Sequence, residues 1–400
     1  MNLVTIVRCL ETFDCLVGNP NFFNFVLYDV GSSFLDTRSQ CLRVEAALQS
    51  KQAKVNYPVD LIRTIAIGMV ILVHASVFPY KIPGEITPTV MVNWFTADIF
   101  GAIGYLGVPL FVMLSGALLL NPAKVDEPMG EFFRKRFNRI GLPLIFWTVV
   151  YFIWSFTVWE KPVTLFNIGQ GLISGSYPIL WFLYLLVGLY LITPILRTLV
   201  KHIDRNQFKL LLAMWFIGTI SVPLIHNFTN FNFNPLMFVI TDWVGFFLLG
   251  IYLTETRIHS TIAYIGLIFG LLVAILGDWF LTASMGEQFT GYFHGYLSFN
   301  MIIASAALFL ILIRIPYSSI DSGNKTINRL IKWIEHNTLP IYLVHIIVIE
   351  SLQLGLLGFS FPYTNNLLVD APLLALVTFV LTATIVYPLK KIPFVMKLIG

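Results

Sequence analysis

Apolar segments of helix length recur along most of this sequence. A stretch of about 20 apolar residues crosses the hydrocarbon core of a bilayer as one helix, whereas barrel strands alternate over about ten residues. Ten such segments lie at about 59–79, 98–120, 140–159, 178–196, 210–226, 236–253, 261–282, 294–313, 338–358 and 369–389. Only 12% of the residues are charged, against about a quarter in soluble proteins. The pattern predicts an all-α polytopic membrane helix bundle of about ten transmembrane helices.

Lys and Arg residues are distributed unevenly among the connections between these segments. Counted alternately from the N-terminus, one set of connections holds 22 of the 25 basic residues, and the other holds only Lys81 and Lys161. Cytoplasmic connections of membrane proteins are the ones enriched in Lys and Arg. The distribution therefore predicts that both termini lie inside (N-in and C-in), and it supports an even number of spans.

Residues 1–54 differ from the rest of the chain. They contain no apolar run long enough to span a bilayer, and they show no signal-peptide pattern. All three cysteines, Cys9, Cys15 and Cys41, lie here without a CxxC pair. We interpret residues 1–54 as a cytoplasmic N-terminal extension of unknown role with free thiols, and residues 55–400 as one membrane domain.

The first apolar segment carries Asp60, Arg63 and His74. Arg63 and His74 are eleven residues apart, so both leave a helix on nearly the same face, about 16 Å apart along its axis. Asp60, three residues before Arg63, joins that face. Ionisable groups within a span are costly unless protein or water covers them, and they mark functional sites. We expect the rest of the bundle to form the wall around this face.

Two interpretations are open for each of these residues. Arg63 either snorkels to the surface and pairs with Asp60, or it binds an anionic ligand that enters from the cytoplasm, since a guanidinium binds phosphate well. His74 is either a hydrogen-bonded core residue or a general base for a hydroxyl group.

A basic loop, EFFRKRFNRIGLP, follows the second segment at residues 131–143 and carries Arg134, Lys135, Arg136 and Arg139. One interpretation is that it sets the topology and contacts anionic lipid head groups. The alternative is a second cationic site for a polyphosphate ligand on the cytoplasmic face.

Asp60 and four further residues are candidates for a substrate pocket. Ser115 lies in the second segment beside Gly116, where packing between helices is the simplest role. Trp181 begins the fourth segment at the outer interface, where an aromatic belt is expected. Tyr342 and His345 are three residues apart on one face of the ninth segment, which favours a structural or pocket-lining role.

Other polar residues fall near the ends of the segments. Asp242, Asp278 and Glu350 lie toward outer ends, either at the head-group level or along an outer acceptor cleft. Five histidines are expected to be solvated or interfacial: His202, His226, His259, His294 and His336.

Several function classes find no support in the sequence. It contains no Walker, HExxH or usable GxSxG motif, which argues against ATP hydrolysis and metalloprotease chemistry. No metal site is expected. The net charge of +4 arises from basic residues between apolar segments, so it indicates topology rather than nucleic-acid binding.

Five stretches together resemble the acyltransferase-3 family of integral-membrane acyltransferases, which modify cell-surface polysaccharides and related glycans. In chain order across residues 59–390 they are VDLIRTIAIGMVILVHA, GVPLFVMLSGALLL, RKRFNRIGLPL, LWFLYLLVGLYLITPILR and TLPIYLVH. Within the family, the chain looks most like the shorter polysaccharide O-acetyltransferases without a fused extracytoplasmic esterase-like domain.

The resemblance implies that residues 55–400 form a membrane acyltransferase domain in a cell membrane, the inner or plasma membrane of a prokaryote. The donor would be cytoplasmic acyl-CoA, usually acetyl-CoA, acting as a co-substrate without a permanently bound cofactor. The acceptor would be a hydroxyl of a glycan or lipid-linked sugar. The family's arginine–histidine pair falls on Arg63 and His74, with His74 as the catalytic base, and its later arginines fall on Arg136 and Arg139.

A transporter or flippase for a small anion or lipid-linked sugar is the alternative, because charges on one face inside a membrane suit a transport pathway equally well. Dependence on CoA separates the two functions, since a transporter needs no thioester. The sequence shows no internal repeat that would favour transport.

Overall fold

The computed structural model describes residues 58–76, 87–228, 242–286, 289–316, 324–358, 360–364 and 366–400. These residues belong to one compact unit that spans residues 57–400. The predicted extension at residues 1–54, its three cysteines and Lys81 lie outside the described residues.

The described parts of the chain contain helices and no strand. The α-helices are α3 (Val59–Ser76), α4 (Pro88–Gly104), α5 (Gly107–Leu119), α6 (Met129–Arg136), α7 (Leu142–Thr157), α8 (Leu165–Ser174), α9 (Trp181–His202), α10 (Arg205–Phe228), α11 (Trp243–Glu255), α12 (Ser260–Met285), α13 (Phe299–Ile313), α15 (Lys325–His336), α16 (Thr338–Gln353), α17 (Leu367–Leu389) and α18 (Pro393–Ile399). Shorter turns are η2 (Pro122–Lys124), η4 (Pro178–Leu180), η7 (Tyr292–His294) and the π-helical turn η3 (Phe137–Gly141).

Each of the ten apolar segments overlaps a helix. Within the described ranges, seven helical runs are long and apolar enough to cross a bilayer: Val59–Ser76, Pro88–Leu119, Met129–Thr157, Leu165–His202, Ser260–Met285, Tyr292–Ile313 and Leu367–Leu389. Helices α10, α11 and α16 overlap the three remaining segments within the described residues. The chain is therefore an all-α, multi-pass membrane protein, while the number of ten spans and the N-in, C-in orientation stay predictions.

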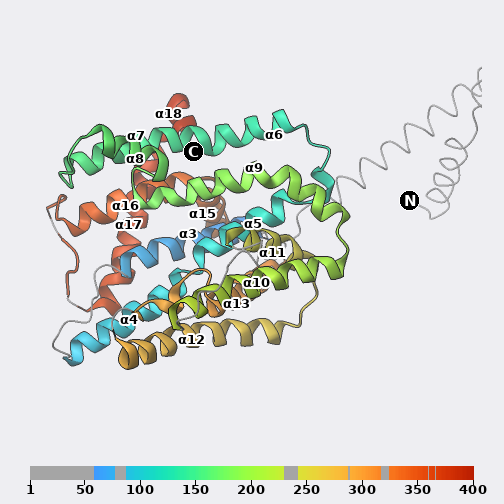
Figure 1. Ribbon diagram of the computed structural model, residues 1–400. Coiled ribbons are helices and arrows are strands. Elements are labelled where there is room, and N and C mark those ends of the chain that lie inside the picture. The colour runs from blue at the N-terminus through green and yellow to red at the C-terminus, as the bar shows by residue number, and fades with distance from the viewer. Residues whose placement is uncertain are drawn as a thin grey trace, which may run out of the picture. The chain divides into compact units, whose positions relative to one another are not determined.

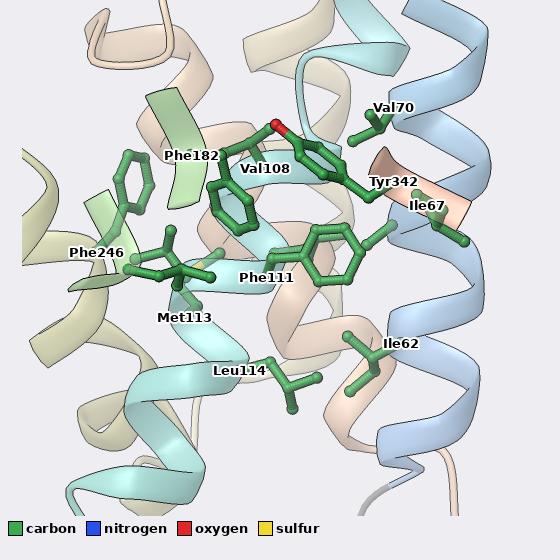
Figure 2. Packing of buried hydrophobic residues seen from close by; sticks show 14 of the residues in the cluster. Ile62, Ile67, Val70, Val108, Phe111, Met113, Leu114, Phe182, Phe246 and Tyr342 are labelled. Carbon is green, nitrogen blue, oxygen red and sulfur yellow. The ribbon is translucent and has the colours of Figure 1, made fainter. Parts of the chain in front are cut away.

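Helix α3 lies inside the bundle, in contact with α4, α5, α15, α16 and α17 (Figure 1). Its apolar residues Ile62 and Ile67 are almost completely buried. Figure 2 shows these side chains directed toward Phe111 and Leu114 of α5 and toward Tyr342 of α16. The charged residues of α3 are thus carried on a helix enclosed by protein, as the cost of placing them in lipid requires.

Helices α5 and α11 approach each other at two glycines. A Cβ atom on Gly116 would lie 1.8 Å from the carbonyl oxygen of Phe247, and one on Gly250 would lie 1.9 Å from that of Met113. Only residues without side chains permit this contact between backbones, which gains dispersion energy where lipid offers no hydrophobic driving force. The close approach fixes α5, which carries Ser115 and Phe111.

Helix α12 lies at one edge of the bundle, packed on α13 (Figure 1). Its outer side chains are large and apolar, and Ile262, Ile268 and Phe280 are 61%, 58% and 63% exposed. A surface of this kind is unfavourable in water and is covered by acyl chains in a bilayer.

The basic stretch at residues 131–143 is helical, so its assignment as a loop is wrong. Helix α6 passes through the π-helical turn η3 into α7 without a break in the chain of helical turns. Phe, Arg and Lys all tolerate a helix, and Pro143 follows the π-helical turn directly, where the regular hydrogen-bond pattern of the helix is already altered. The arginines therefore project from a rigid element.

Candidate functional site

A basic cavity of about 550 Å³ lies at the Arg63 end of α3. Five cationic side chains line it: Arg63, Lys124, Arg136, Arg139 and Lys390. They come from four separate parts of the sequence. Apart from Arg63, they belong to connections that the charge distribution predicts to be cytoplasmic. We call this the basic cavity.

The π-helical turn places two of these arginines. Arg136 ends α6 and Arg139 lies within η3, three residues later. A π-helical turn inserts an extra residue into the helix, which changes the direction of the side chains that follow, and such turns are frequent at functional sites. Both arginines consequently reach the basic cavity from one helical run.

Arg63 forms an ion pair with Glu335 of α15, which also lines the basic cavity. The interpretation that Arg63 pairs with Asp60 is therefore wrong. Asp60 does not line this cavity, and its backbone carbonyl accepts a 2.8 Å hydrogen bond from the Thr64 hydroxyl. Helix α15, from a distant part of the chain, packs against α3 and brings the Glu335 carboxylate to Arg63.

Arg136 lies against two aromatic rings in the basic cavity. Its guanidinium carbon is 5.3 Å from the ring centroid of Phe132 and 5.6 Å from that of Tyr190. Within the described residues its buried Nε finds no hydrogen-bond acceptor, and neither Arg136 nor Arg139 forms an ion pair. Unpaired guanidinium groups attract phosphate or carboxylate, for which their planar geometry is suited.

Lys390 adds to the positive potential. Partial burial, followed by the charge of Arg139, lowers the pKa of the Lys390 ammonium from its ordinary value. Burial is the larger cause of this shift, and repulsion by the like charge of Arg139 is the smaller one. An anion bound among these groups would relieve that repulsion.

Arg197 of α9 is a residue whose role the sequence did not reveal. Its side chain is buried, and its Nε and NH1 groups donate to the carbonyl oxygens of Leu119 (2.5 Å) and Lys124 (3.2 Å). NH1 also pairs with Glu127 at 2.9 Å. These bonds fix the connection after α5 that carries Lys124. In the sequence, Arg197 counted only toward the positive-inside bias.

His74 and His345 lie side by side, with ring centroids 5.3 Å apart. His345 is fully buried, and its Nδ1 is 2.6 Å from the carbonyl oxygen of Tyr342. Because a carbonyl only accepts, Nδ1 carries the hydrogen and Nε2 keeps its lone pair. Within the described residues, Nε2 has no hydrogen-bond partner.

Tyr342 connects the histidine pair to the basic cavity. Its ring lines that cavity and lies 5.7 Å from the ring of His345. Its hydroxyl donates 2.9 Å to the carbonyl oxygen of Ile179, which fixes the ring between α3 and α5 (Figure 2). The structure thus forms a continuous series from cationic residues through an aromatic wall to two imidazoles.

The remaining candidates, Ser115 and Trp181, line two different cavities. Ser115 lines the basic cavity from α5. Trp181 lines a second cavity of about 470 Å³ with Trp243 and Tyr296. Aromatic and aliphatic side chains line the second cavity, so Trp181 contributes to a wall inside the protein, while its place in an aromatic belt stays a prediction.

Two outer polar residues lie inside the protein. His294 is buried, so the expectation that it is solvated is wrong. Asp278, only 1% exposed, does not lie at head groups, which leaves the alternative that it lines a cleft. A hydrogen bond of 2.9 Å joins the two side chains and satisfies both, although the hydropathy pattern predicts that each lies near the end of a helix. Glu350 accepts hydrogen bonds from the indoles of Trp154 (2.6 Å) and Trp159 (3.1 Å) and from the Tyr177 hydroxyl.

The chain was compared with known proteins. The model of the acyltransferase-3 family, described as an acyltransferase domain, matches residues 56–390. A protein of Acidianus two-tailed virus named "Putative acetyltransferase ORF330" is 30% identical over an alignment 191 residues long, which covers 43% of this chain and 56% of that relative. The alignment therefore spans little more than half the relative's length. No solved structure matches the chain significantly.

The family match extends over nearly all the described helices, including those that hold the basic cavity and the histidine pair. By this match, the chain belongs to the acyltransferase-3 family.

Proposed function

We propose that this protein is an O-acyltransferase of a prokaryotic cell membrane. It moves an acyl group, acetyl in the simplest case, from cytoplasmic acyl-CoA to a hydroxyl of a cell-surface or lipid-linked glycan. The observation that supports this most directly is the basic cavity whose aromatic wall, Tyr342, adjoins His345 and through it His74.

The shape of the donor fits this arrangement. CoA carries phosphates at one end and its thioester at the end of a long flexible arm. Arg63 and His74 lie on one helix about 16 Å apart along its axis, so phosphates held at the basic cavity leave the arm free to extend toward His74. Arg136 and Arg139 have no competing carboxylate partner among the described residues, which suits them to bind phosphate.

The chemistry assigned to His74 is general-base catalysis. Its imidazole accepts the proton of the acceptor hydroxyl, and the oxygen attacks the thioester carbonyl. The carbon–sulfur bond then breaks, the ester forms, and CoA leaves as a thiolate that takes up a proton. His345 packs against His74 and supports its ring orientation from the buried side.

Radiolabelled acetyl-CoA tests the function directly. Purified full-length protein in lipid nanodiscs should bind CoA and transfer label to a glycan or glycolipid acceptor. Release of free CoA from acetyl-CoA when no acceptor is present would support acyl-CoA as the donor but would not identify the acceptor. Absence of CoA binding would contradict the proposal and favour the transporter alternative.

Neutral replacement of the cavity arginines should weaken donor binding. We expect Arg136→Ala and Arg139→Ala each to raise the dissociation constant for CoA about tenfold, since each loses a charge-assisted bond worth about 1.5 kcal/mol. Isothermal titration calorimetry measures the constant. Arg134→Ala is the matched control, because Arg134 lies on the same helix but is exposed and does not line the cavity. Equal effects at all three positions would argue against a specific site.

Glu335 competes with an anionic ligand for Arg63. Glu335→Gln removes that competing charge, so we expect CoA to bind about threefold more tightly, within the range of a partly exposed ion pair. Dissociation constants for Glu335→Gln and for the exposed control Glu131→Gln provide the comparison. Weaker binding in Glu335→Gln would show that Glu335 holds Arg63 in place for the ligand instead.

A further inference from the structure

A third cavity, of about 200 Å³, lies between α4, α12 and η7. Its lining includes Trp94, Asp98, Tyr105, Asp278 and His294. Neither the basic cavity nor the histidine pair uses any of these residues. A water occupies about 30 Å³ of liquid, so the space admits a group much larger than water. We call this the Asp98 cavity.

Three hydrogen bonds hold the carboxylate of Asp278 in place. Its Oδ2 accepts from the backbone N–H of Gly291 at 2.6 Å and from Nδ1 of His294 at 2.9 Å, and its Oδ1 accepts from the N–H of Phe293 at 2.9 Å. The side chain is fully buried. Asp278 therefore organises the turn around η7 and orients His294.

Both ring nitrogens of His294 also have hydrogen-bond partners. Its Nδ1 faces Asp278, and its Nε2 lies 3.1 Å from the backbone carbonyl of Asp98 and 3.4 Å from Oδ1 of that carboxylate. All these oxygens are acceptors, so both ring nitrogens carry hydrogens in this arrangement. A metal ion needs an imidazole lone pair, and here none is free. The three residues lie close enough to share an ion, but their hydrogen bonds oppose it.

Of these three residues, Asp98 has a carboxylate oxygen that can accept a further hydrogen bond. Its side chain is more than nine-tenths buried and lines the cavity, and its Oδ2 has no hydrogen-bond partner among the described residues. An orphaned buried carboxylate oxygen costs free energy unless a donor satisfies it. The group that fits is a hydroxyl, which donates one hydrogen bond and carries no charge.

The walls of the Asp98 cavity are aromatic. Trp94 and Tyr105 line it, and the Tyr105 ring lies 5.0 Å from that of Tyr296, which lines the neighbouring aromatic cavity. Gly295 lines both cavities. An aromatic face beside a single acceptor suits a ligand with an apolar face and hydroxyls on its rim, which describes a sugar ring.

The position relative to α3 relates this cavity to the reaction. A Cβ atom on Gly104 would lie 2.6 Å from Cβ of Val73, so α4 touches α3 directly beside His74. Tyr105, the next residue, lines the Asp98 cavity. The cavity is therefore at the His74 end of α3, whereas the basic cavity is at the Arg63 end.

We propose that the Asp98 cavity binds a sugar ring of the acceptor, with Asp98 accepting a hydrogen bond from a ring hydroxyl and Trp94 and Tyr105 packing on its apolar face. This inference rests on the proposed acyl transfer. It adds that donor and acceptor enter from opposite ends of α3. Asp98 determines acceptor binding and has no part in CoA binding.

The test uses full-length protein in nanodiscs without glycoside detergents. Methyl β-D-glucopyranoside and methyl N-acetyl-β-D-glucosaminide serve as probes, measured by thermal stabilisation and as acceptors of label from acetyl-CoA. We expect Asp98→Asn to raise the acceptor KM at least tenfold while the dissociation constant for CoA stays unchanged. Asp126→Asn, an exposed acid that lines none of the three cavities described above, is the control.

A second variant covers the case in which Asp98→Asn folds poorly. Trp94→Leu removes the aromatic wall, leaves the acid in place, and should raise the acceptor KM similarly. An unchanged acceptor KM in both variants would overturn the proposal, as would the absence of any glycoside effect on the wild type. Stabilisation by Mn²⁺ or Ca²⁺ that is lost in Asp98→Asn, without a glycoside effect, would establish a cation site instead. Glycoside stabilisation without acyl transfer would preserve the site and contradict the proposed reaction.

Discussion

His74→Ala should lower the rate of acyl transfer by about 10²- to 10⁴-fold, the contribution typical of a positioned general base. Its CoA affinity should stay unchanged, because the substitution lies about three helical turns from Arg63. Turnover with labelled acetyl-CoA and calorimetric titration of CoA separate the two quantities. A binding defect of similar size would show that His74 supports the donor site and not the chemistry.

The neighbouring imidazole provides the internal comparison. His345→Ala opens a buried space beside His74, so it should reduce transfer by a smaller factor and also lower thermal stability. His202→Ala serves as the control, since His202 is exposed and its Nδ1 lies 2.9 Å from the Thr198 carbonyl oxygen of its own helix. If His74→Ala kept full turnover while His345→Ala lost it, the base would be His345.

Gly116→Ala and Gly250→Ala should each destabilise the fold by about 3 kcal/mol, at the upper end for overpacked cores. The added methyl group would lie within 2 Å of a backbone carbonyl oxygen on the facing helix, and backbone atoms cannot rotate away. Helices α5 and α11 must then separate. Thermal unfolding and monodispersity in detergent measure the loss.

Gly188→Ala in α9 is the matched control, because nothing lies within 4 Å of the Cβ that it would add. That variant should be neutral or slightly stabilising, since alanine favours helix over glycine by about 1 kcal/mol. Equal stability of Gly116→Ala and Gly188→Ala would show that α5 and α11 can part without cost. Reduced CoA binding in Gly116→Ala would follow from displacement of Ser115 and Phe111, which line the basic cavity.

Hydropathy and charge were sufficient to predict the class of fold. Twenty-residue apolar segments have few alternatives to membrane helices, and the spacing of Arg63 and His74 follows from helical geometry alone. The predicted cluster of Arg63, Arg136 and Arg139 meets in one cavity. Tyr342 and Ser115 also line this cavity. The sequence indicates only that Tyr342 shares a helix face with His345 and that Ser115 has a packing role.

The sequence does not reveal which side chains of different helices contact one another. Glu335 is more than 250 residues from Arg63, and no local rule connects them. Nothing in the sequence distinguishes Asp98, because one acid near the start of an apolar segment resembles an interfacial charge. For the same reason the sequence predicts that His294 is solvated or interfacial, and it leaves Asp278 either at the head-group level or in an outer cleft. Burial of a helix end depends on which neighbours cover it, and periodicity carries no information on that.

Helix α16 is attached to its surroundings at two levels that bracket His345. The Tyr151 hydroxyl donates 2.8 Å to the carbonyl oxygen of Leu343, and farther along Glu350 receives the Trp154 indole. A sliding or rotating α16 would break both. Both bonds tie α16 to α7, so we expect motions that admit a bulky substrate to displace α16 less than α4. Site-directed spin labels placed on α4 and α16 would therefore report unequal amplitudes of motion.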